Sequence, residues 1–138
     1  MIILDTNVIS ALMREVPDPK VIAWLDQQPR TSMWTTSITV LEVQFGIAIL
    51  EHGKRRSFLA IALDALLEKI DRRVAPFDLA AAQEAGNLMA SRKKKGRPVE
   101  LRDTMIAGIA LAQRAALATR NTAHFEDISA RVINPWTV

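Results

Sequence analysis

Short apolar runs alternate along the chain with longer stretches whose apolar residues recur at helical spacing. An unbroken apolar run of a few residues is typical of a strand that is buried on both faces, as in a parallel sheet. Apolar or β-rich runs of this kind occur at Met1–Leu4, Met33–Thr36, Val74–Phe77, Ala116–Thr119 and Arg131–Pro135. Strands that alternate with helices predict βαβ units, so the sequence predicts an α/β fold with a mostly parallel central sheet.

Six helical stretches and one helical turn separate or follow these runs. We expect them at Val8 to about Glu15, from Pro19 with Asp18 as its cap, Val40 to about His52 with Gly53 as its stop, Ser57–Ile70, after Asp78 to about Lys95, Thr104 to about Ala115, and Phe125–Ile128. Capping residues, an early proline and a following glycine are the signals used. The chain has 138 residues and no internal repeat or linker, so we expect a single domain over 1–138.

Three boundaries matter for the chemistry considered below. Ser37 or Thr39 is expected to cap the second long helix, which would put Glu42 in its first turn. Gly96-Arg97-Pro98 is expected to break the chain, with Gly96 directly after a helix end. Val99–Arg102 would then lead up to Asp103, which is expected to open the next helix.

Composition narrows the class of protein. The hydrophobic fraction is 49% and no apolar stretch is long enough to span a bilayer, so no membrane segment is expected. An acid ends the first apolar run after four residues, so we expect no signal peptide. The chain has no cysteine, which excludes disulfides, thiolate metal sites and a cysteine nucleophile, and is consistent with a cytoplasmic protein.

The net charge is +3, and the basic residues gather in clusters. They lie at Lys54-Arg55-Arg56, Arg72-Arg73 and Arg92-Lys93-Lys94-Lys95. Such clusters favour a polyanionic partner, but each also has a simpler explanation as a solvated surface. The last cluster stands at an expected helix C-terminus, where cations complement the helix dipole.

The first strand runs directly into Asp5-Thr6-Asn7. In open α/β sheets, ligands bind at the carboxyl ends of the strands, which is where Asp5 is expected to lie. We therefore interpret Asp5 as the first ligand of a divalent-metal site. The alternative is that Asp5-Thr6-Asn7 only caps the following helix, since all three residue types are good N-caps.

Polar residues at other strand ends and helix starts are expected at the same edge as Asp5. Because parallel strands with right-handed crossovers end on one side, Glu42, Asp103 and Asn121 can meet Asp5 there. Carboxylates that cluster repel one another unless a cation lies between them, and oxygen ligands suit Mg²⁺ or Mn²⁺. Such a site is suited to phosphate chemistry. Taken singly, each residue can instead serve a helix dipole, a cap or a turn.

Other candidates for catalysis are weaker. His52 and His124 are isolated in the sequence, and a lone histidine is more often a surface or structural residue. The chain has no phosphate-binding loop and no dinucleotide fingerprint. Trp24, Trp34 and Trp136 are interpreted as core or interface anchors, because no aromatic residue interleaves with the basic clusters.

The polar positions together resemble the motifs of PIN-domain ribonucleases, and most closely the VapC-type toxins of toxin–antitoxin pairs in their FitB-like branch. The resemblance lies in the order and spacing of segments that together cover essentially the whole chain. These segments are Asp5-Thr6-Asn7-Val8, Thr39-Val40-Leu41-Glu42-Val43-Gln44-Phe45-Gly46, Asp103-Thr104-Met105-Ile106-Ala107, Thr119-Arg120-Asn121 and Asn134-Pro135-Trp136.

The resemblance implies a three-layer α/β/α sandwich around a mostly parallel sheet, and an endoribonuclease that depends on Mg²⁺ or Mn²⁺. It also implies a homodimer, neutralisation by a VapB-like antitoxin, and contact with promoter DNA only through that antitoxin. By position, Asp5, Glu42 and Asp103 would be the metal-binding acids, and Asn121 stands where the family often has a fourth acid.

The residues around these acids have implied roles as well. Thr6, Asn7 and Thr119 would orient Asp5 by hydrogen bonds, as residues behind a metal ligand do. Basic residues near the motifs would hold the RNA backbone, and the candidates are Arg97, Arg102 and Arg120.

Two alternatives to the nuclease remain. The first is a catalytically weak or idle PIN scaffold that acts only through antitoxin and DNA binding, an alternative that Asn121 leaves open. The second is a receiver-type signalling module, in which a strand-end aspartate is phosphorylated beside Mg²⁺. Receivers need a further acid pair beside the first strand and a lysine near the last strand, and the sequence has neither.

Overall fold

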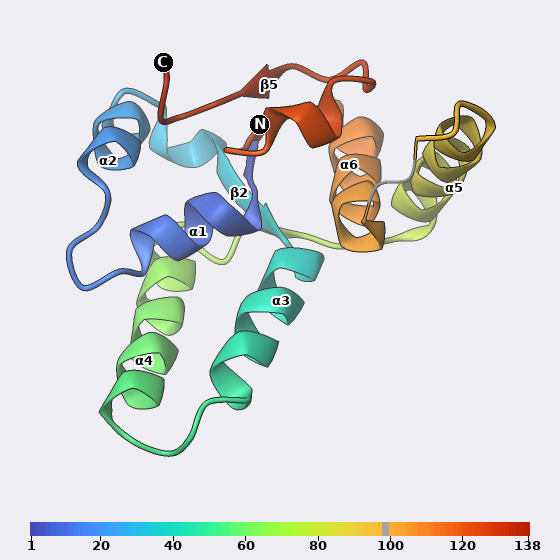
Figure 1. Ribbon diagram of the computed structural model, residues 1–138. Helices are drawn as coiled ribbons and strands as arrows, with labels where there is room; N and C mark the ends of the chain where they lie inside the picture. Colours follow the sequence, from blue (N-terminus) through green and yellow to red (C-terminus); the bar gives the residue numbers. More distant parts are fainter. Residues whose placement is uncertain (98–99) are drawn as a thin grey trace.

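Five strands form the central sheet in the computed structural model, which describes residues 1–97 and 100–138 (Figure 1). Every neighbouring pair of strands is parallel, and the order across the sheet is β3-β2-β1-β4-β5. The strands are β1 (Ile2–Leu4), β2 (Met33–Thr36), β3 (Val74–Ala75), β4 (Ala116–Ala118) and β5 (Val132–Ile133). The α/β fold with a parallel sheet predicted from the sequence is confirmed, and β5 forms one edge of the sheet.

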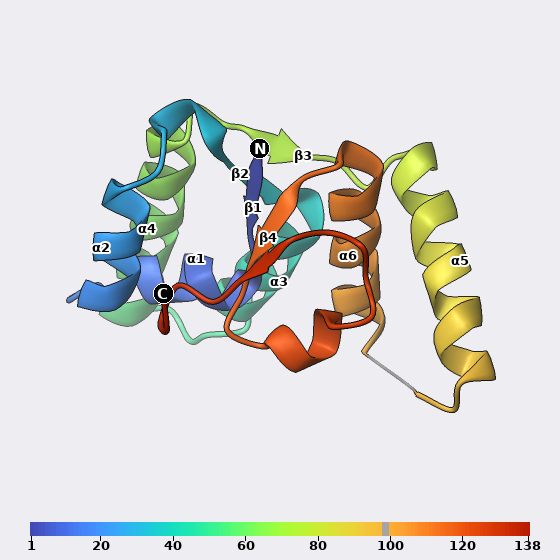
Figure 2. The ribbon, with the colours of Figure 1, turned by 90° about the horizontal axis from the view of Figure 1, so that it is seen from above.

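The helices cover both faces of this sheet, as expected for the predicted three-layer sandwich. Seen from above, α1, α2 and α4 lie on one side of the strands, and α5 and α6 lie on the other (Figure 2). The helices are α1 (Thr6–Leu12), α2 (Pro19–Asp26), α3 (Ser37–Ala48), α4 (Lys54–Lys69), α5 (Leu79–Lys94) and α6 (Leu101–Gln113), with two 3₁₀ turns, η1 (Arg30–Ser32) and η2 (Thr122–Phe125). Over the described residues, the helices are all too short or too polar to cross a membrane.

Strand β1 is the point at which the chain changes direction across the sheet. From β1 the chain passes to β2 and β3 on one side, and it later returns through α5 and α6 to β4 on the other side. A crevice forms at such a switch point, outside the carboxyl ends of the two strands that diverge. The residues that follow β1 and β4 therefore border the natural binding crevice of the fold.

Two apolar clusters hold the layers together, one on each face of the sheet. Successive residues of β1 divide between them, with Leu4 in the cluster under α1, α2, α3 and α4, and Ile3 in the cluster under α5 and α6. Helices α5 and α6 pack closely at Gly108. A Cβ atom at this position would lie 2.6 Å from the carbonyl oxygen of Ala81. The short strands are thus fixed by burial on both faces.

Several helix ends follow the predicted signals. Asp18 caps α2 by accepting a hydrogen bond from the Lys20 amide, and Pro19 is the first residue of that helix. Asp78 caps α5 in the same way. At the other end of α5, Gly96 has φ +63°, and the amides of Gly96 and Arg97 donate to the carbonyls of Lys93 and Arg92. This pair of bonds is a Schellman motif, which requires the left-handed conformation that glycine tolerates.

Other predicted helix starts were wrong by a few residues. Thr36, and neither Ser37 nor Thr39, caps α3: its hydroxyl accepts from the Thr39 amide, so the helix begins as soon as β2 ends. Glu42 consequently lies in the second turn and not the first. In the same way, Gly53 precedes α4 and does not terminate α3.

The start of α6 also differs from the prediction. Glu100 is the N-cap, since its side chain accepts a hydrogen bond from the Asp103 amide at 3.3 Å. Asp103 therefore lies in the first helical turn, where its negative charge interacts favourably with the helix dipole. The predicted break at Gly96-Arg97-Pro98 and the approach from Val99 fall partly on residues 98–99, which lie outside the described residues.

Candidate active site

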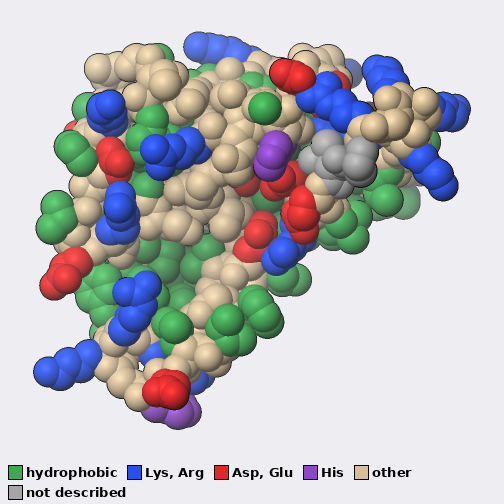
Figure 3. All heavy atoms as spheres, in the orientation of Figure 1, with side chains coloured by type: hydrophobic (Ala, Val, Ile, Leu, Met, Phe, Trp, Pro, Cys, Tyr) green, Lys and Arg blue, Asp and Glu red, His purple; other side chains and the backbone are tan. Residues whose placement is uncertain are grey.

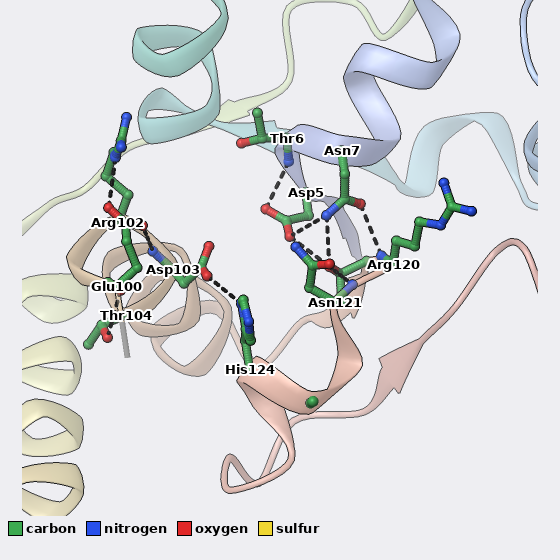
Figure 4. Close-up of polar contacts among 12 residues, drawn as sticks. Asp5, Thr6, Asn7, Glu100, Arg102, Asp103, Thr104, Arg120, Asn121 and His124 are labelled. Atoms are coloured by element: carbon green, nitrogen blue, oxygen red, sulfur yellow. Dashed lines mark hydrogen bonds and ion pairs between the residues drawn. The ribbon is translucent and has the colours of Figure 1, made fainter. Parts of the chain in front are cut away.

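Asp5 directly follows β1 and bonds to the end of β4, at the edge of the sheet where the crevice of this fold is expected. Its amide continues the sheet by donating to the Ala118 carbonyl at 2.9 Å, and its side chain caps α1 through the Thr6 amide at 2.8 Å. The helix-capping alternative for Asp5 is therefore correct in part. The second carboxylate oxygen, however, turns to a different set of partners across the crevice (Figure 4).

Those partners come from two separate segments and hold the Asp5 carboxylate in place. Thr119, which directly follows β4, donates its hydroxyl to Oδ2 of Asp5 at 2.7 Å. The Asn7 amide group reaches the same oxygen at 3.3 Å and the Thr119 hydroxyl at 3.3 Å. Asn7 also accepts from the Arg120 amide at 3.0 Å, which joins the loop after β4 to the start of α1. The side chains expected to orient Asp5 thus contact it or its neighbours.

Glu42 is connected to Asp5 through Thr6. The Thr6 amide contacts Asp5, while the Thr6 hydroxyl donates to Oε1 of Glu42 at 3.0 Å. The other oxygen of Glu42 lies 3.8 Å from the Arg102 guanidinium. Thr6 therefore fixes the distance between two carboxylates that lie 37 positions apart in the chain.

Asp103 approaches the crevice from the first turn of α6, and its partner was not found by the sequence analysis. Oδ2 of Asp103 lies 2.7 Å from Nδ1 of His124, which belongs to η2 (Figure 4). The sequence analysis treated His124 as isolated and missed this contact, because the two residues lie 21 positions apart in the chain. The one available signal was that His124 lies three residues after Asn121, the last residue of the Thr119-Arg120-Asn121 motif.

Asn121 begins the η2 turn at the mouth of the crevice. Its amide donates to the Thr119 hydroxyl at 3.1 Å, so Thr119 connects the loop backbone to Asp5. The Asn121 side chain is exposed and points toward Asp5 and Asn7 (Figure 4). The structure thus brings all four polar positions predicted for the site to one edge of the sheet.

Burial and, to a smaller extent, nearby negative charges make Asp5 a weaker acid than usual. Burial raises the pKa of Asp5 to about 6, although the hydrogen bonds from Thr119 and Thr6 oppose the rise. The charges of Asp103 and Glu42 make the smallest contributions to this rise, and they show that both carboxylates lie near Asp5. The pKa of Glu42 is also raised, first by burial and then by Glu100 and Asp103, against the effects of Thr6 and Arg102.

These acids fit a hydrated divalent cation. Among the described residues, no three acidic, histidine or cysteine side chains converge closely enough to enclose an ion, so the acids line the crevice without meeting in it. Mg²⁺ is commonly held by one or two carboxylates with several waters retained, which suits such a spacing. A cation between them would also relieve the repulsion that raises the pKa of Asp5.

The basic residues predicted to hold RNA are all engaged with other groups. Arg97 pairs with Glu126 and donates to the Ala123 carbonyl. Arg102 pairs with Glu100 at 2.9 Å and approaches Glu42. The guanidinium of Arg120 lies 4.9 Å from the ring centroid of Trp136. Arg102 is the one of the three that lies directly beside the acids.

The basic clusters are mostly solvated surfaces, and Arg73 and Arg92 are the exceptions. Arg73 donates to the carbonyls of Met33 and Arg30, and Arg92 is buried. Lys93, Lys94 and Lys95 remain exposed at the end of α5. In the space-filling view, acidic side chains gather near the start of α6 with basic side chains around them (Figure 3).

A groove of about 930 Å³ opens beside Glu42, between α1, α3 and α4. Its floor is apolar, and basic side chains lie along its rim. The apolar residues include Met13, Val43, Ile47, Leu50, Phe58 and Leu59, and the basic ones are Arg14, Lys54, Arg55 and Arg102. Gly46 faces the groove, and a Cβ atom there would meet nothing within 4 Å. The groove thus joins the acid site to a surface that an apolar segment can fill.

Comparison with known proteins places these features in a family. The profile of the PIN domain matches residues 2–130. "VapC ribonuclease Y4jK" of Sinorhizobium fredii is 42% identical over 137 residues, which are 99% of this chain and 98% of that protein. "Toxin FitB" of Neisseria gonorrhoeae is 35% identical over 137 residues, which are 99% of each. A structure of FitAB bound to the IR36 DNA fragment has a TM-score of 0.89 and 34% identity, and the match covers 100% of this chain and 97% of that one.

Proposed function

Because the chain belongs to the PIN domain family, with a VapC ribonuclease and the toxin FitB among its relatives, we propose that it is a Mg²⁺- or Mn²⁺-dependent endoribonuclease toxin of a type II toxin–antitoxin system. The observation that carries the proposal is the gathering of Asp5, Glu42 and Asp103 at one edge of the sheet, where Thr6 bonds to both Asp5 and Glu42. Carboxylates gathered in this way are suited to a cation. Cleavage of RNA in this way would inhibit growth.

Each residue of the site has a definite part in this proposal. Asp5, Glu42 and Asp103 would hold the divalent ion, which supplies phosphate neutralisation and a water of lowered pKa. Thr6 and Thr119 hold the Asp5 carboxylate in one orientation by hydrogen bonds of 2.8 and 2.7 Å. Preorganised groups of this kind lower the barrier because they need not rearrange during the reaction.

Arg102 is the residue proposed to meet the RNA phosphate. Its guanidinium already lies beside Glu42 and Glu100, and its side chain is half exposed. A guanidinium can exchange a carboxylate for a phosphate, since both accept paired hydrogen bonds. The exposed Asn121 side chain offers an amide at the same mouth of the crevice, where a phosphate oxygen or a water can accept from it.

The test compares two aspartates that both cap helices. Asp5→Asn is expected to abolish cleavage of a labelled RNA in Mn²⁺, because it removes the carboxylate at the centre of the site. Asp78→Asn is the control, since the Asp78 side chain also caps a helix, through the Ala81 amide, and asparagine is an equally good cap. Cleavage by Asp5→Asn at the wild-type rate, or wild-type cleavage that survives a chelator, would contradict the proposal.

The idle-scaffold alternative rests on Asn121, which carries no charge at the position where the family often has an acid. It predicts that the purified toxin cleaves no RNA at any Mn²⁺ concentration, although it still joins an antitoxin that binds DNA. The same cleavage assay decides between the two. The receiver alternative has lost its basis, because the chain belongs to the PIN family.

The antitoxin is proposed to occupy the groove beside Glu42. The apolar floor and basic rim of the groove suit a segment that carries apolar and acidic side chains. Gly46→Trp should fill the groove without a clash and allow growth arrest even when the neighbouring antitoxin frame is co-expressed. Gln44→Trp, an exposed position on α3 outside the groove lining, should leave the rescue intact. Rescue that is equal in both variants would place the antitoxin elsewhere.

Two further partners complete the proposal. We propose a homodimer, as the resemblance implies, and contact with promoter DNA only through the antitoxin. Sedimentation of the toxin alone and of the toxin–antitoxin complex with operator DNA tests both points. DNA binding by the toxin without its antitoxin would contradict the second.

A further inference from the structure

Arg92 is the one basic residue among the buried polar side chains of the described chain, and its exposed fraction is 3%. Its guanidinium makes four hydrogen bonds that join three segments. Nε and Nη2 donate to the two oxygens of Asp127 at 2.8 Å each, Nη2 donates to the His124 carbonyl at 2.7 Å, and Nη1 donates to the Thr104 hydroxyl at 2.8 Å. A buried charge is tolerated only when it is paired in this way.

The partners of Arg92 are next to the acid site. Thr104 directly follows Asp103, and the His124 residue whose carbonyl accepts from Arg92 also contacts Oδ2 of Asp103 through its ring. The contacts therefore close a ring that runs from Asp103 through Thr104, Arg92 and His124 back to Asp103. Asp127 completes the charge balance of the guanidinium, and its own pKa is lowered chiefly by the hydrogen bond from Arg92.

The ring matters because Asp103 has weaker support than Asp5. Asp5 stands on a strand end and accepts hydrogen bonds from Thr6, Asn7 and Thr119. Among the described residues, only His124 bonds to the Asp103 carboxylate; Asp103 lies in the first turn of α6 and His124 in the four-residue turn η2. Phe125 packs η2 into the apolar cluster of α6, and Arg92 is the buried polar side chain that bonds to both segments.

We propose that Arg92 and Asp127 form a positioning pair that holds α6 against η2 and so presents Asp103 and His124 to the active site. The proposal rests on the proposed function in so far as Asp103 serves as a metal-binding acid. Arg92 itself touches neither the metal-binding oxygens nor the crevice. A buried ion pair is weak evidence for stability, because well-packed apolar residues often serve as well. If the pair fixes the positions of Asp103 and His124, its loss should change the His124 signals and metal binding. Loss of a pair that only stabilises the fold should change neither.

Asp127→Asn and Glu126→Gln make a matched comparison in the full-length protein. Each removes one negative charge from neighbouring positions, and each removes the partner of an arginine, since Asp127 pairs with Arg92 and Glu126 with Arg97. Only Asp127 is bonded to a member of the ring behind Asp103, namely Arg92. Arg92→Lys is a second variant, because it keeps the charge but cannot bridge three partners as a guanidinium does.

The first readout concerns the position of His124 and needs no metal and no activity. The chain has two histidines, so the ring signals of His124 are assigned in NMR spectra by comparison with a His52→Asn variant. Asp127→Asn and Arg92→Lys should shift and broaden the His124 ring signals while those of the exposed His52 stay unchanged. Glu126→Gln should leave both sets as in the wild type.

The second readout is Mn²⁺ binding by calorimetry together with steady-state RNA cleavage, at a temperature well below each melting point. Loss of a residue that orients a metal ligand typically costs about 10- to 100-fold in metal affinity or activity. We therefore expect Asp127→Asn and Arg92→Lys to weaken Mn²⁺ binding about 10-fold and to lower kcat with KM little changed. Glu126→Gln should stay within about twofold of the wild type, as for an exposed ion pair.

The outcomes separate this proposal from the proposed function. Unchanged His124 signals in both variants of the pair, or wild-type Mn²⁺ binding in both, would overturn the positioning role. Wild-type protein that neither binds Mn²⁺ nor cleaves RNA would overturn the metal-dependent nuclease, and the His124 signals would still decide whether Arg92 and Asp127 hold the two segments together.

Discussion

The two sides of the acid site are built by different means. Asp5 follows a strand that is buried on both faces, and it is itself 2% exposed with three neighbouring side chains or amides bonded to it. Asp103 stands in the first turn of a helix, and its side chain is 18% exposed with His124 as its partner. The first side is thus specified by the sheet, whereas the second depends on the packing of α6 against η2.

The difference teaches which interactions a substitution will disturb. On the Asp5 side, the backbone position is fixed, so a change acts through the charge and its acidity. On the Asp103 side, the backbone position is itself maintained by side chains, so a change acts through geometry. In the proposed function both sides bind the same cation, and each side can be tested separately.

The largest expected difference between the two sides is in stability near neutral pH. The folded-state pKa of Asp5 is about 6, above its ordinary value of 3.8, so the folded protein holds this proton more tightly than the unfolded chain does. The stabilising effect of the proton is complete below about pH 4 and is lost as the pH rises through 6. Above that pH the buried charge costs roughly 3 kcal/mol, at about 1.4 kcal/mol per pKa unit.

Asp5→Asn removes this cost, so in chelator at pH 7.5 it should melt several degrees above the wild type while it cleaves no RNA. Asp103→Asn should also lose cleavage but melt close to the wild type, because its side chain is not fully buried. Melting curves from pH 4 to 8 measure both. A wild-type stability that does not fall between pH 4 and 6 would contradict the assignment of Asp5.

The sequence predicts the Asp5 side of the site better than the Asp103 side. Buried strands such as Ile2–Leu4 and Met33–Thr36 were recognised, because a short apolar run ending in polar residues leaves few alternatives. The common edge of Asp5, Glu42 and Asp103 then follows from parallel topology alone. Such reasoning places backbone positions, but it places no side-chain partners.

What the sequence did not predict depends on contacts between distant segments. Arg92 lies in a basic run typical of a solvated helix end, and its burial is decided by Asp127, 35 positions away. The contact of His124 with Asp103 likewise needs α6 and η2 to be packed together first. Helix starts were displaced where a strand residue, Thr36, took the capping role. These features belong to the side of the site that tertiary packing specifies.

The next largest effect is expected from Thr119→Val, which keeps the shape of the residue and removes its hydroxyl. The hydrogen bond from Thr119 lowers the pKa of Asp5, so its loss should raise that pKa above about 6. RNA cleavage at pH 7 should fall about 10-fold and recover toward pH 8.5, since a protonated carboxyl binds cations poorly. Rates measured across this pH range check the shift, and a loss that is equal at every pH would indicate a structural cause instead.

A smaller effect is expected from His124→Ala, which removes the contact with Asp103. The pair is partly exposed, so about 1 kcal/mol, or roughly a fivefold loss of cleavage, is the expected size. The control is His52→Ala, an exposed change far along the chain from the acids. Single-turnover cleavage rates measure the effect, and a His124 variant as active as the His52 variant would show that Asp103 needs no partner.

The smallest effect is expected from Arg102→Ala. This side chain is half exposed, and its pairs with Glu100 and Glu42 should contribute little to stability, as exposed ion pairs do. The melting point should therefore change little, while KM for RNA rises about two- to fivefold with a weaker dependence on salt. Titration of the cleavage rate against RNA at two salt concentrations checks this prediction. A salt dependence equal to that of the wild type would remove Arg102 from the RNA contact.

The central claim is that side chains from the end of β1, the second turn of α3 and the first turn of α6 share one divalent cation. Crystals soaked in Mn²⁺ test it most directly, because the anomalous signal of manganese locates the ion without any assumption about activity. We predict one strong peak bordered by Asp5, Glu42 and Asp103 in the wild type, and none there in Asp5→Asn. A wild-type crystal without that peak, from protein that still cleaves RNA, would contradict the account.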